Sequence, residues 1–367
     1  MAIAIDLFAG GGGLSLGLRW SGFDIALAND IDKDSCATHR LNHHETTVIQ
    51  DDIRNVDFVG ALESIGIQDK VNLIAGGPPC QGFSTVGSKK EDDERNMMFC
   101  EYLRVVEKVH PDFVLFENVS GFRSMYGGKM YRMLLAGLDH LGYDIWNSVL
   151  NAVNFGVPQS RRRTIVVGFR KGFDFTPPVA HYASRIDSGD IFNSRLLRPM
   201  TLKDAIYDLP FLQSGEGSTE YRSEPQSEYQ RKMRGEISKL TEHECPNHGE
   251  HLLKILQAVP IGGSIMDVPK ELRPKNYFSN SYGRLKWDEP SSTITGNLGT
   301  PSSNRCVHPE CNRGLTTREG ARIQGFPDSY AFVGRRGSKN QQIGNAVPPI
   351  LGYKLGLSII RSLQKGR

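Results

Sequence analysis

The stretch IAIDLFAGGGGLSLGL (residues 3–18) begins as a short apolar run, passes through four consecutive glycines and continues with apolar residues at helical spacing. A strand, a glycine turn and a helix in this order let a nucleotide approach the backbone at the start of the helix. The dinucleotide pattern G-x-G-x-x-G is met only in part, because Gly10 and Gly12 fit whereas Ser15 takes the third glycine position. A tight turn without a ligand is the alternative that this stretch alone leaves open.

Similar apolar runs alternate with helix-like stretches over the first half of the chain. The runs predict strands at 23–30, 46–52, 71–77, 113–119, 146–152 and 163–169, and the intervening stretches predict helices at 33–44, 95–109 and 128–142. Nearly all-apolar strands that alternate with helices predict an α/β fold with a doubly wound, Rossmann-like parallel sheet covered on both faces. The later sequence is polar with little periodicity, which predicts a second, smaller and less regular domain.

Acidic residues stand at the ends of the first three predicted strands. Asp30 is placed for ribose hydroxyls, and Asp52 for the amino group of an adenine. Acids at three successive strand ends, without a full dinucleotide pattern, favour S-adenosylmethionine over NAD. Helix N-capping is the alternative explanation for either acid taken singly.

A second unusual stretch is GGPPCQGFS (residues 76–84), which holds Cys80 in a turn made of prolines and glycines. Proline locks φ and glycine permits close approach, so the turn keeps the thiol still and reachable. Glu117 lies at the end of the next predicted strand, in LFENV. Arg161 and Arg163 precede a further strand and share one side if that start is extended. We therefore expect a thiol, a carboxyl group and a guanidinium at one sheet edge.

These motifs occur in the order that characterises the cytosine-C5 DNA methyltransferases: DLFAGGGG (6–13), GGPPCQGFS (76–84), ENV (117–119), QSRRR (159–163) and QIGNAVP (342–348). The stretch at 287–330 also resembles that family. The resemblance extends from residue 3 to about residue 355, except for a variable middle of roughly 170–280. It implies a catalytic, S-adenosylmethionine-binding domain over 1–185 plus 338–367, and a target-recognition domain with hinge over 186–337.

The resemblance implies a role for each matching residue. Cys80 is the nucleophile, Glu117 the partner of cytosine N3 and Arg163 the partner of O2, and Arg161 supports the site or the DNA backbone. Ile31 stands where some members have an aromatic residue beside the adenine. The implied contacts to S-adenosylmethionine, which leaves as S-adenosylhomocysteine, are Phe8, Gly10, Gly12, Asp30, Ile31, Asp52, Ile53, Pro79, Asn345 and Ala346.

Double-stranded DNA is the expected partner. Residues 1–160 carry a net charge of −8 and residues 161–367 one of +11, and this asymmetry is consistent with a polyanion ligand. A solvated basic face is the alternative that the charges alone leave open. A cytosine within a duplex must be flipped out before it can react, and the segment after Cys80 resembles a loop that closes over it. Ser84, Gln159, Arg284 and Lys286 are candidate DNA contacts.

Two clusters of cysteine and histidine suggest a metal at first sight. They comprise His243, Cys245, His248 and His251, and Cys306, His308 and Cys311. Their spacing fits no regular pair of zinc knuckles, so we expect no metal.

Other classes of protein fit less well. No apolar run approaches the ~20 residues that span a membrane, and the start lacks a signal peptide, so we expect a cytoplasmic, nucleoid-associated monomer. A methyltransferase acting on tRNA and a catalytically silent DNA-binding regulator are alternatives, and an NAD-dependent oxidoreductase leaves the Pro-Pro-Cys turn unexplained. The resemblance favours a modification enzyme, and whether a separate restriction endonuclease accompanies it stays open.

Overall fold

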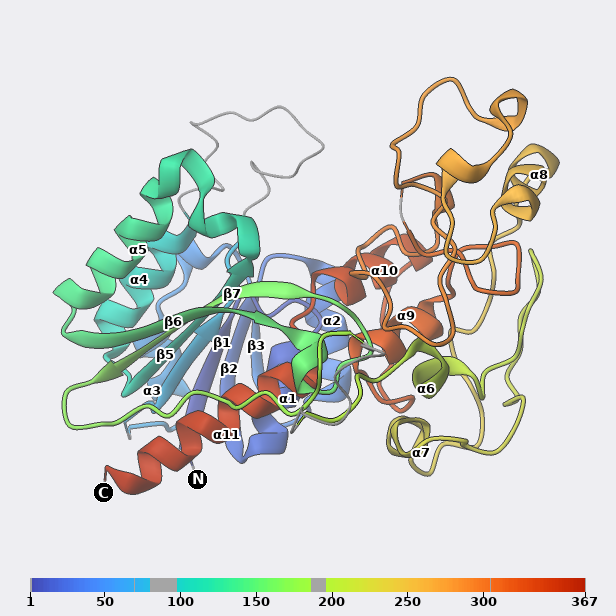
Figure 1. Ribbon diagram of the computed structural model, residues 1–367. Coiled ribbons are helices and arrows are strands. Elements are labelled where there is room, and N and C mark those ends of the chain that lie inside the picture. Colours follow the sequence, from blue (N-terminus) through green and yellow to red (C-terminus); the bar gives the residue numbers. More distant parts are fainter. Residues whose placement is uncertain (1, 69, 80–97, 186–195, 304, 367) are drawn as a thin grey trace. The chain divides into compact units, whose positions relative to one another are not determined.

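The computed structural model describes residues 2–68, 70–79, 98–185, 196–303 and 305–366 (Figure 1). The chain forms two compact units. Unit 1 comprises Met1–Asn151, Arg162–Val179 and Pro349–Arg367, and unit 2 comprises Ala152–Arg161 and Ala180–Pro348.

Unit 1 is built on a seven-stranded sheet with the order β3-β2-β1-β4-β5-β7-β6. The strands are β1 (Ala2–Leu7), β2 (Phe23–Asp30), β3 (Thr47–Gln50), β4 (Leu73–Gly76), β5 (Phe113–Val119), β6 (Tyr143–Asn151) and β7 (Arg162–Arg170). The chain winds outward from β1 to β3 and then returns to β4, so the strand order reverses between β1 and β4. Ligands of such sheets bind beyond the carboxyl ends of the strands at this reversal. The glycine turn after β1 and the segment 77–79 after β4 both leave the sheet there.

The expectation of a fully parallel sheet is wrong for one strand. β7 runs antiparallel to both of its neighbours, β5 and β6. Only Ala152–Arg161 joins β6 to β7, whereas a parallel crossover needs a dozen or more residues. The reversal has a chemical consequence, because it brings the beginning of β7 to the edge where β5 ends. In this register Arg163 lies opposite Val119.

Helices surround the sheet of unit 1. They are α1 (Gly13–Ser21), α2 (Lys33–Asn42), α3 (Phe58–Ser64), α4 (Met98–Val109), α5 (Lys129–His140) and α11 (Pro349–Lys365), with short 3-10 turns at Ile53–Asn55, Ser120–Arg123 and Met125–Gly128. Figure 1 shows α4 and α5 side by side and α11 running beside α1. A Cβ on Gly17 would lie 2.3 Å from the carbonyl oxygen of Pro349, so α1 and α11 pack in direct backbone contact.

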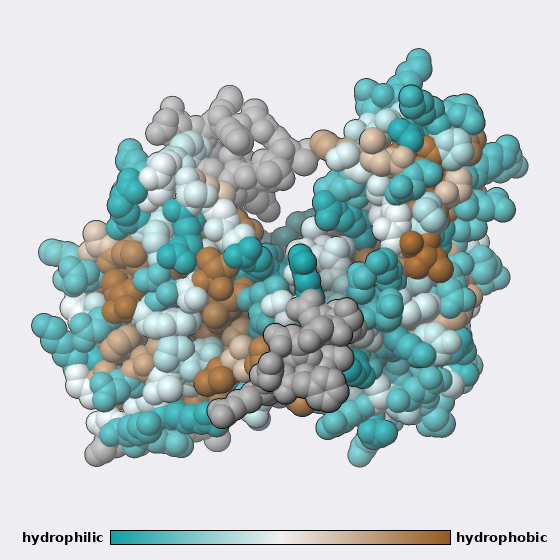
Figure 2. Space-filling view, viewed as in Figure 1, coloured by the Kyte–Doolittle hydropathy of each residue, from teal (hydrophilic) through white to brown (hydrophobic). Residues whose placement is uncertain are grey.

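Unit 2 consists of short helices joined by long irregular segments. Its helices are α6 (Leu202–Ile206), α7 (Glu228–Arg234), α8 (Glu250–Ala258), α9 (Thr317–Gln324) and α10 (Arg336–Asn345), with 3-10 turns at Ala152–Phe155, Ile265–Asp267, Lys270–Leu272 and Pro301–Ser303. Strand pairing in its described residues is limited to isolated bridges. The predicted less regular second part of the α/β fold is therefore confirmed. On the face seen in Figure 2, hydrophilic residues cover most of this unit.

Candidate active site

The glycine turn after β1 has an unusual backbone. Phe8, Gly10 and Gly12 all adopt left-handed conformations, with φ values of 54°, 53° and 83°. Such a φ is strained for phenylalanine and costs about 1–3 kcal/mol, a cost that structures retain mainly at ligand sites. A Cβ built on Gly10 would meet no atom within 4 Å, so open space lies beside the turn.

Asp30, at the end of β2, holds this turn from one side. Its Oδ2 accepts a hydrogen bond from the backbone N–H of Gly10 at 2.8 Å, and its Oδ1 accepts one from Asp32 at 2.8 Å. Asp32, not Asp30, caps α2, so helix capping does not explain Asp30. Burial raises the pKa of Asp30. The next side chain, Ile31, is 69% exposed and presents an apolar surface beside the carboxylate.

Asp52 is placed differently. Its carboxylate accepts a hydrogen bond from the backbone N–H of Arg54 as an N-cap, and it pairs with the Arg54 guanidinium at 2.7 Å. These hydrogen bonds lower the pKa of Asp52. The capping explanation therefore applies to Asp52. Ile53 is almost completely buried beneath it, and a cofactor contact for either residue stays a prediction.

Cys80 and Ser84 lie outside the described residues, but the backbone that leads to Cys80 is described. The side-chain amide of Asn118 donates to the carbonyl of Pro78 at 3.0 Å and so holds the turn against β5. A Cβ on Gly77 would lie 3.1 Å from Oε2 of Glu117, so a side chain at this position would press against the carboxylate. Pro79 is half-buried. Asn118 received no role from the sequence, although it stands within the ENV motif.

Glu117 and Arg163 form an ion pair at the edge of the sheet where β5 ends and β7 begins. Nε of Arg163 lies 2.9 Å from Oε1 of Glu117, and the two side chains are only 13% and 9% exposed. Burial lowers the pKa of Arg163, and the charge of Glu117 opposes that shift. β5 and β7 are neighbours, and the antiparallel direction of β7 makes the contact possible. The pair offers a planar ligand an acceptor and a donor side by side.

Arg161 and Gln159 belong to unit 2, and their side chains are buried there. The Arg161 guanidinium donates to the carbonyls of Ile294, Gly344 and Ala346 at 2.9–3.0 Å. Gln159 accepts a hydrogen bond from the backbone N–H of Ile294 and donates to the side chain of Gln324. β7 begins at Arg162, so the extended alternation expected for Arg161 and Arg163 does not reach Arg161.

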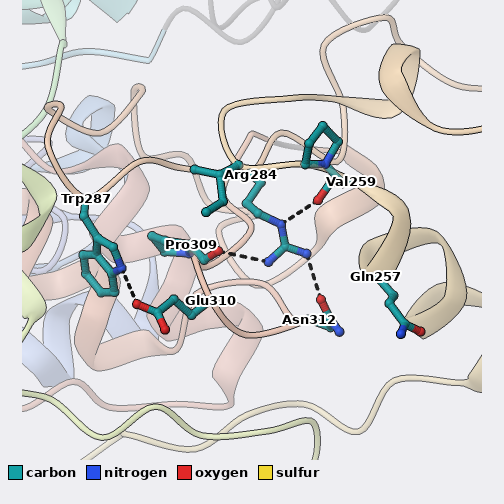
Figure 3. Close-up of a pocket in the computed structure, with 9 residues that line it drawn as sticks. Gln257, Val259, Arg284, Trp287, Pro309, Glu310 and Asn312 are labelled. Atoms are coloured by element: carbon teal, nitrogen blue, oxygen red, sulfur yellow. Dashed lines mark hydrogen bonds between the residues drawn. The ribbon is translucent and has the colours of Figure 1, made fainter.

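Arg284 also has an internal role in unit 2. Its buried guanidinium donates to backbone carbonyls at the end of α8 and in the segment after Val307, including those of Leu256, Val259 and His308. Arg284 is one of the residues that line a pocket of about 470 Å³, together with Trp287 and Glu310 (Figure 3). Lys286 is an exposed partner of Glu289. Our proposal for DNA contacts therefore leaves out Gln159 and Arg284.

The remaining predicted positions are at the end of α10. Asn345 is exposed and accepts a hydrogen bond from Gln341, and Ala346 is half-buried. Both belong to unit 2.

The two cysteine–histidine clusters have other partners. His243 contacts Thr316 and the carbonyl of Pro210, each at 3.0 Å, and His308 accepts backbone hydrogen bonds from Glu310 and Cys311. In the described ranges, no group of three or more His, Cys, Asp or Glu could hold a metal ion. No helix in the same ranges is long and apolar enough to cross a membrane.

Comparison with known proteins gives consistent matches. A family model described as C-5 cytosine-specific DNA methylase matches residues 3–361. The chain is 33% identical to Type II methyltransferase M.AgeI of Thalassovita gelatinovora, over 97% of this chain and 98% of that protein. It is 34% identical to Type II methyltransferase M1.HphI of Haemophilus parahaemolyticus, over 97% and 86% of the respective chains.

Solved structures agree with the sequence matches. The crystal structure of a putative DNA modification methyltransferase encoded within a prophage, from E. coli, superposes with a TM-score of 0.78 at 25% identity and covers 99% of this chain and 100% of that one. The family, the fold class and the enzyme class predicted from the sequence are confirmed.

Proposed function

Because the chain belongs to the C-5 cytosine-specific DNA methylase family, we propose that it transfers a methyl group from S-adenosylmethionine to C5 of a cytosine flipped out of duplex DNA. We further propose that it serves as the modification enzyme of a restriction–modification system, as the Type II names of its relatives suggest. Unit 1 carries the chemistry in this proposal, and unit 2 recognises the target sequence.

The buried pair of Glu117 and Arg163 beside the Pro78 turn is the observation that carries the proposal. Cytosine presents N3, the 4-amino group and O2 along one edge. A protonated Glu117 can donate to N3, and its other oxygen can accept from the amino group. The described contacts of Arg163 use Nε and Nη1, and we assign Nη2 to O2 of the base.

C5 of cytosine is a poor nucleophile, and the proposed arrangement of Cys80, Glu117 and Arg163 makes it more nucleophilic. The thiolate of Cys80 adds to C6, and the electrons of the C5=C6 bond become available at C5. Glu117 and Arg163 stabilise the charge that moves onto N3 and O2. After C5 is methylated, a base removes H5, the C5=C6 bond re-forms and the C6–S bond breaks with its electron pair on sulfur, which regenerates the Cys80 thiolate. Cys80 must be reachable and deprotonated for the first step.

The glycine turn fits a nucleoside cofactor. Open space beside Gly10, the carboxylate of Asp30 and the exposed face of Ile31 occur together at the strand-order reversal. Asp30 would accept from ribose hydroxyls, and Ile31 would pack on the adenine. When bound, S-adenosylmethionine supplies an electrophilic methyl group.

The first experiment is transfer of labelled methyl from S-adenosylmethionine to a mixed-sequence duplex, with Cys80→Ala beside the wild type. We expect label on C5 of cytosine with the wild type only, and mapping of the labelled cytosines would give the recognition sequence. Label in tRNA but not in DNA would replace the proposed substrate. No label in either, with DNA binding intact, would favour a silent DNA-binding regulator.

A further inference from the structure

Four polar side chains lie buried directly beneath the glycine turn. The hydroxyl of Ser15, in the first turn of α1, donates to Oδ2 of Asp6 at the end of β1, at 2.6 Å. Nε2 of His39, on α2, lies 3.0 Å from the same hydroxyl oxygen. The ring of His43 lies 4.5 Å from that of His39 and interacts with the backbone of Gly12. None of the four is more than 1% exposed.

The hydrogen bonds fix how the protons are placed. When Asp6 is ionised, Ser15 uses its only hydrogen on Asp6, and its oxygen then accepts the second hydrogen bond from Nε2–H of His39. Nδ1 of His39 has no hydrogen-bond partner within the described part of the chain, as expected for a neutral ring whose hydrogen is on Nε2. Burial, helped by His43, Arg19 and Arg40, lowers the pKa of His39 to about 3, which keeps it neutral.

The chain of contacts spans the two ends of the turn. Asp6 precedes the turn and Ser15 follows it, so their hydrogen bond closes the segment that contains the left-handed Phe8, Gly10 and Gly12. A strained backbone persists only where its surroundings over-determine it. Asp30 fixes the turn from the side that faces the ligand, whereas Ser15 and His39 fix it from within the core.

From this geometry we propose that Ser15 and His39 are positioning residues for cofactor binding, which hold the glycine turn through Asp6 in the conformation that receives S-adenosylmethionine. The inference rests on the proposed function. Ser15 takes the third glycine position of the dinucleotide pattern, so a side chain that breaks that pattern supplies the hydrogen bond that stiffens the turn. Neither residue touches the reacting atoms, so the effect is on affinity.

The test is calorimetric binding of S-adenosylhomocysteine to the full chain, beside steady-state kinetics with S-adenosylmethionine. We expect Ser15→Ala and His39→Leu each to raise Kd about tenfold, the effect of one unmade buried hydrogen bond. KM for the cofactor should rise in parallel while kcat changes less than about threefold. His39→Gln retains an N–H donor in place of Nε2–H and should restore most of the affinity.

Ser21→Ala is the matched control. It removes another buried hydroxyl from the same helix, one that donates to the Leu18 carbonyl within that helix, and should leave Kd within about twofold. If the Ser15→Ala and His39→Leu proteins fold and bind with the wild-type Kd, this inference is overturned while the proposed function stands. Equal losses for His39→Gln and His39→Leu would also overturn it, since packing would then explain the effect. Wild-type protein that binds no S-adenosylhomocysteine would overturn the proposed cofactor as well.

Discussion

The two units differ in what fills their interiors. Unit 1 is held by a continuous apolar cluster in which side chains such as Phe116, Val114 and Leu134 are completely buried between the sheet and its helices. In unit 2 the largest fully buried side chains include Arg313, Arg318 and Arg322, none of which is measurably exposed. Both units enclose apolar clusters, but unit 2 also buries paired charges in its interior.

The helix α9 shows how unit 2 accommodates these charges. Each of its residues is buried, so it has no hydrophilic face of the kind that a surface helix presents. Arg322 binds Asp328 at 2.6 Å and Asp208 at 3.2 Å, and Arg318 lies 3.2 Å from Glu242. Arg313, just before the helix, makes a two-pronged contact with Glu319 at 2.7 and 2.9 Å.

This difference has an energetic meaning. Apolar packing is non-directional and tolerates changes of similar volume. A buried ion pair adds little net stability, but loss of one partner leaves a charge in the interior and is strongly destabilising. Some of the pairs of unit 2 join segments that are distant in sequence, such as Asp208 with Arg322. We infer that they specify one arrangement of loops that have little regular hydrogen bonding.

The largest expected effect is that of Glu319→Gln, which leaves Arg313 buried without its carboxylate. We expect a loss of about 3–5 kcal/mol in the free energy of unfolding. Urea unfolding followed by Trp287 fluorescence, with Trp20 and Trp146 replaced by Phe, reports on unit 2. Glu289→Gln, at an exposed pair, should cost less than about 1 kcal/mol. Similar losses for both variants would remove the distinction between interior and surface charge.

In unit 1 the corresponding change is Leu134→Ala, which removes a completely buried side chain from the apolar cluster. A loss of about 2–4 kcal/mol is expected from transfer and cavity terms. This loss should be the same at pH 4 and pH 7. The loss from Glu319→Gln should shrink in acid, because the Arg313 charge holds the pKa of Glu319 below its usual value of 4.5 and its stabilisation is lost as the pH falls through that lowered pKa.

The stability that Asp6 contributes to unit 1 depends on pH in the opposite direction to that of Glu319, because it decreases as the pH rises. Burial raises its pKa from 3.8 to about 7, so the folded state binds the proton more tightly than the unfolded state. The resulting stabilisation is complete below pH 3.8 and is lost as the pH rises through about 7. Asp6→Asn should flatten this part of the profile, measured as the Tm at pH 4 and pH 8 with Trp20 as the reporter. A wild-type Tm that rises between pH 4 and pH 8 as much as that of the variant would contradict the assignment.

The smallest expected effect on stability is that of Lys286→Ala, since the side chain is on the surface. If Lys286 contacts a DNA phosphate, the slope of log Kd against log salt should fall by about one. Arg284→Met, two residues away, should destabilise unit 2 and leave that slope unchanged in the folded fraction, because its donors are used internally. A changed slope for Arg284→Met alone would reverse the two assignments.

The sequence predicted the core of unit 1 well, because buried strands leave unbroken apolar runs. β2 and β5 match their predicted limits to the residue, and the contact between Glu117 and Arg163 follows from neighbouring strand ends. The direction of β7 could not be read from periodicity, since a strand has the same pattern in either direction.

For unit 2, the sequence suggested the wrong location for several arginine side chains. Arginine is usually exposed, so the charge excess of the second half suggested a basic surface. Arg161, Arg284, Arg313, Arg318 and Arg322 contribute to that excess, yet all are buried. Their partners are carbonyls and acids, some only six residues away, as Glu319 is from Arg313, and others far along the chain, as Asp208 is from Arg322. Composition does not reveal such partners. Helix capping, in contrast, is local, yet the sequence left it open for both Asp30 and Asp52, and the structure assigns it to Asp32 and Asp52.

The direct contact between α1 and α11 can form only late in the synthesis of the chain. Gly17 emerges early from a ribosome, but its neighbour Pro349 is made about 330 residues later, and at 5–20 residues per second this takes roughly 15–70 s. During that interval the apolar side of α1, with Leu14 and Leu18, lacks the helix that packs against it. Unit 2 is complete before unit 1, although unit 1 holds the first strand. A nascent chain must therefore keep the incomplete sheet soluble while the rest is translated.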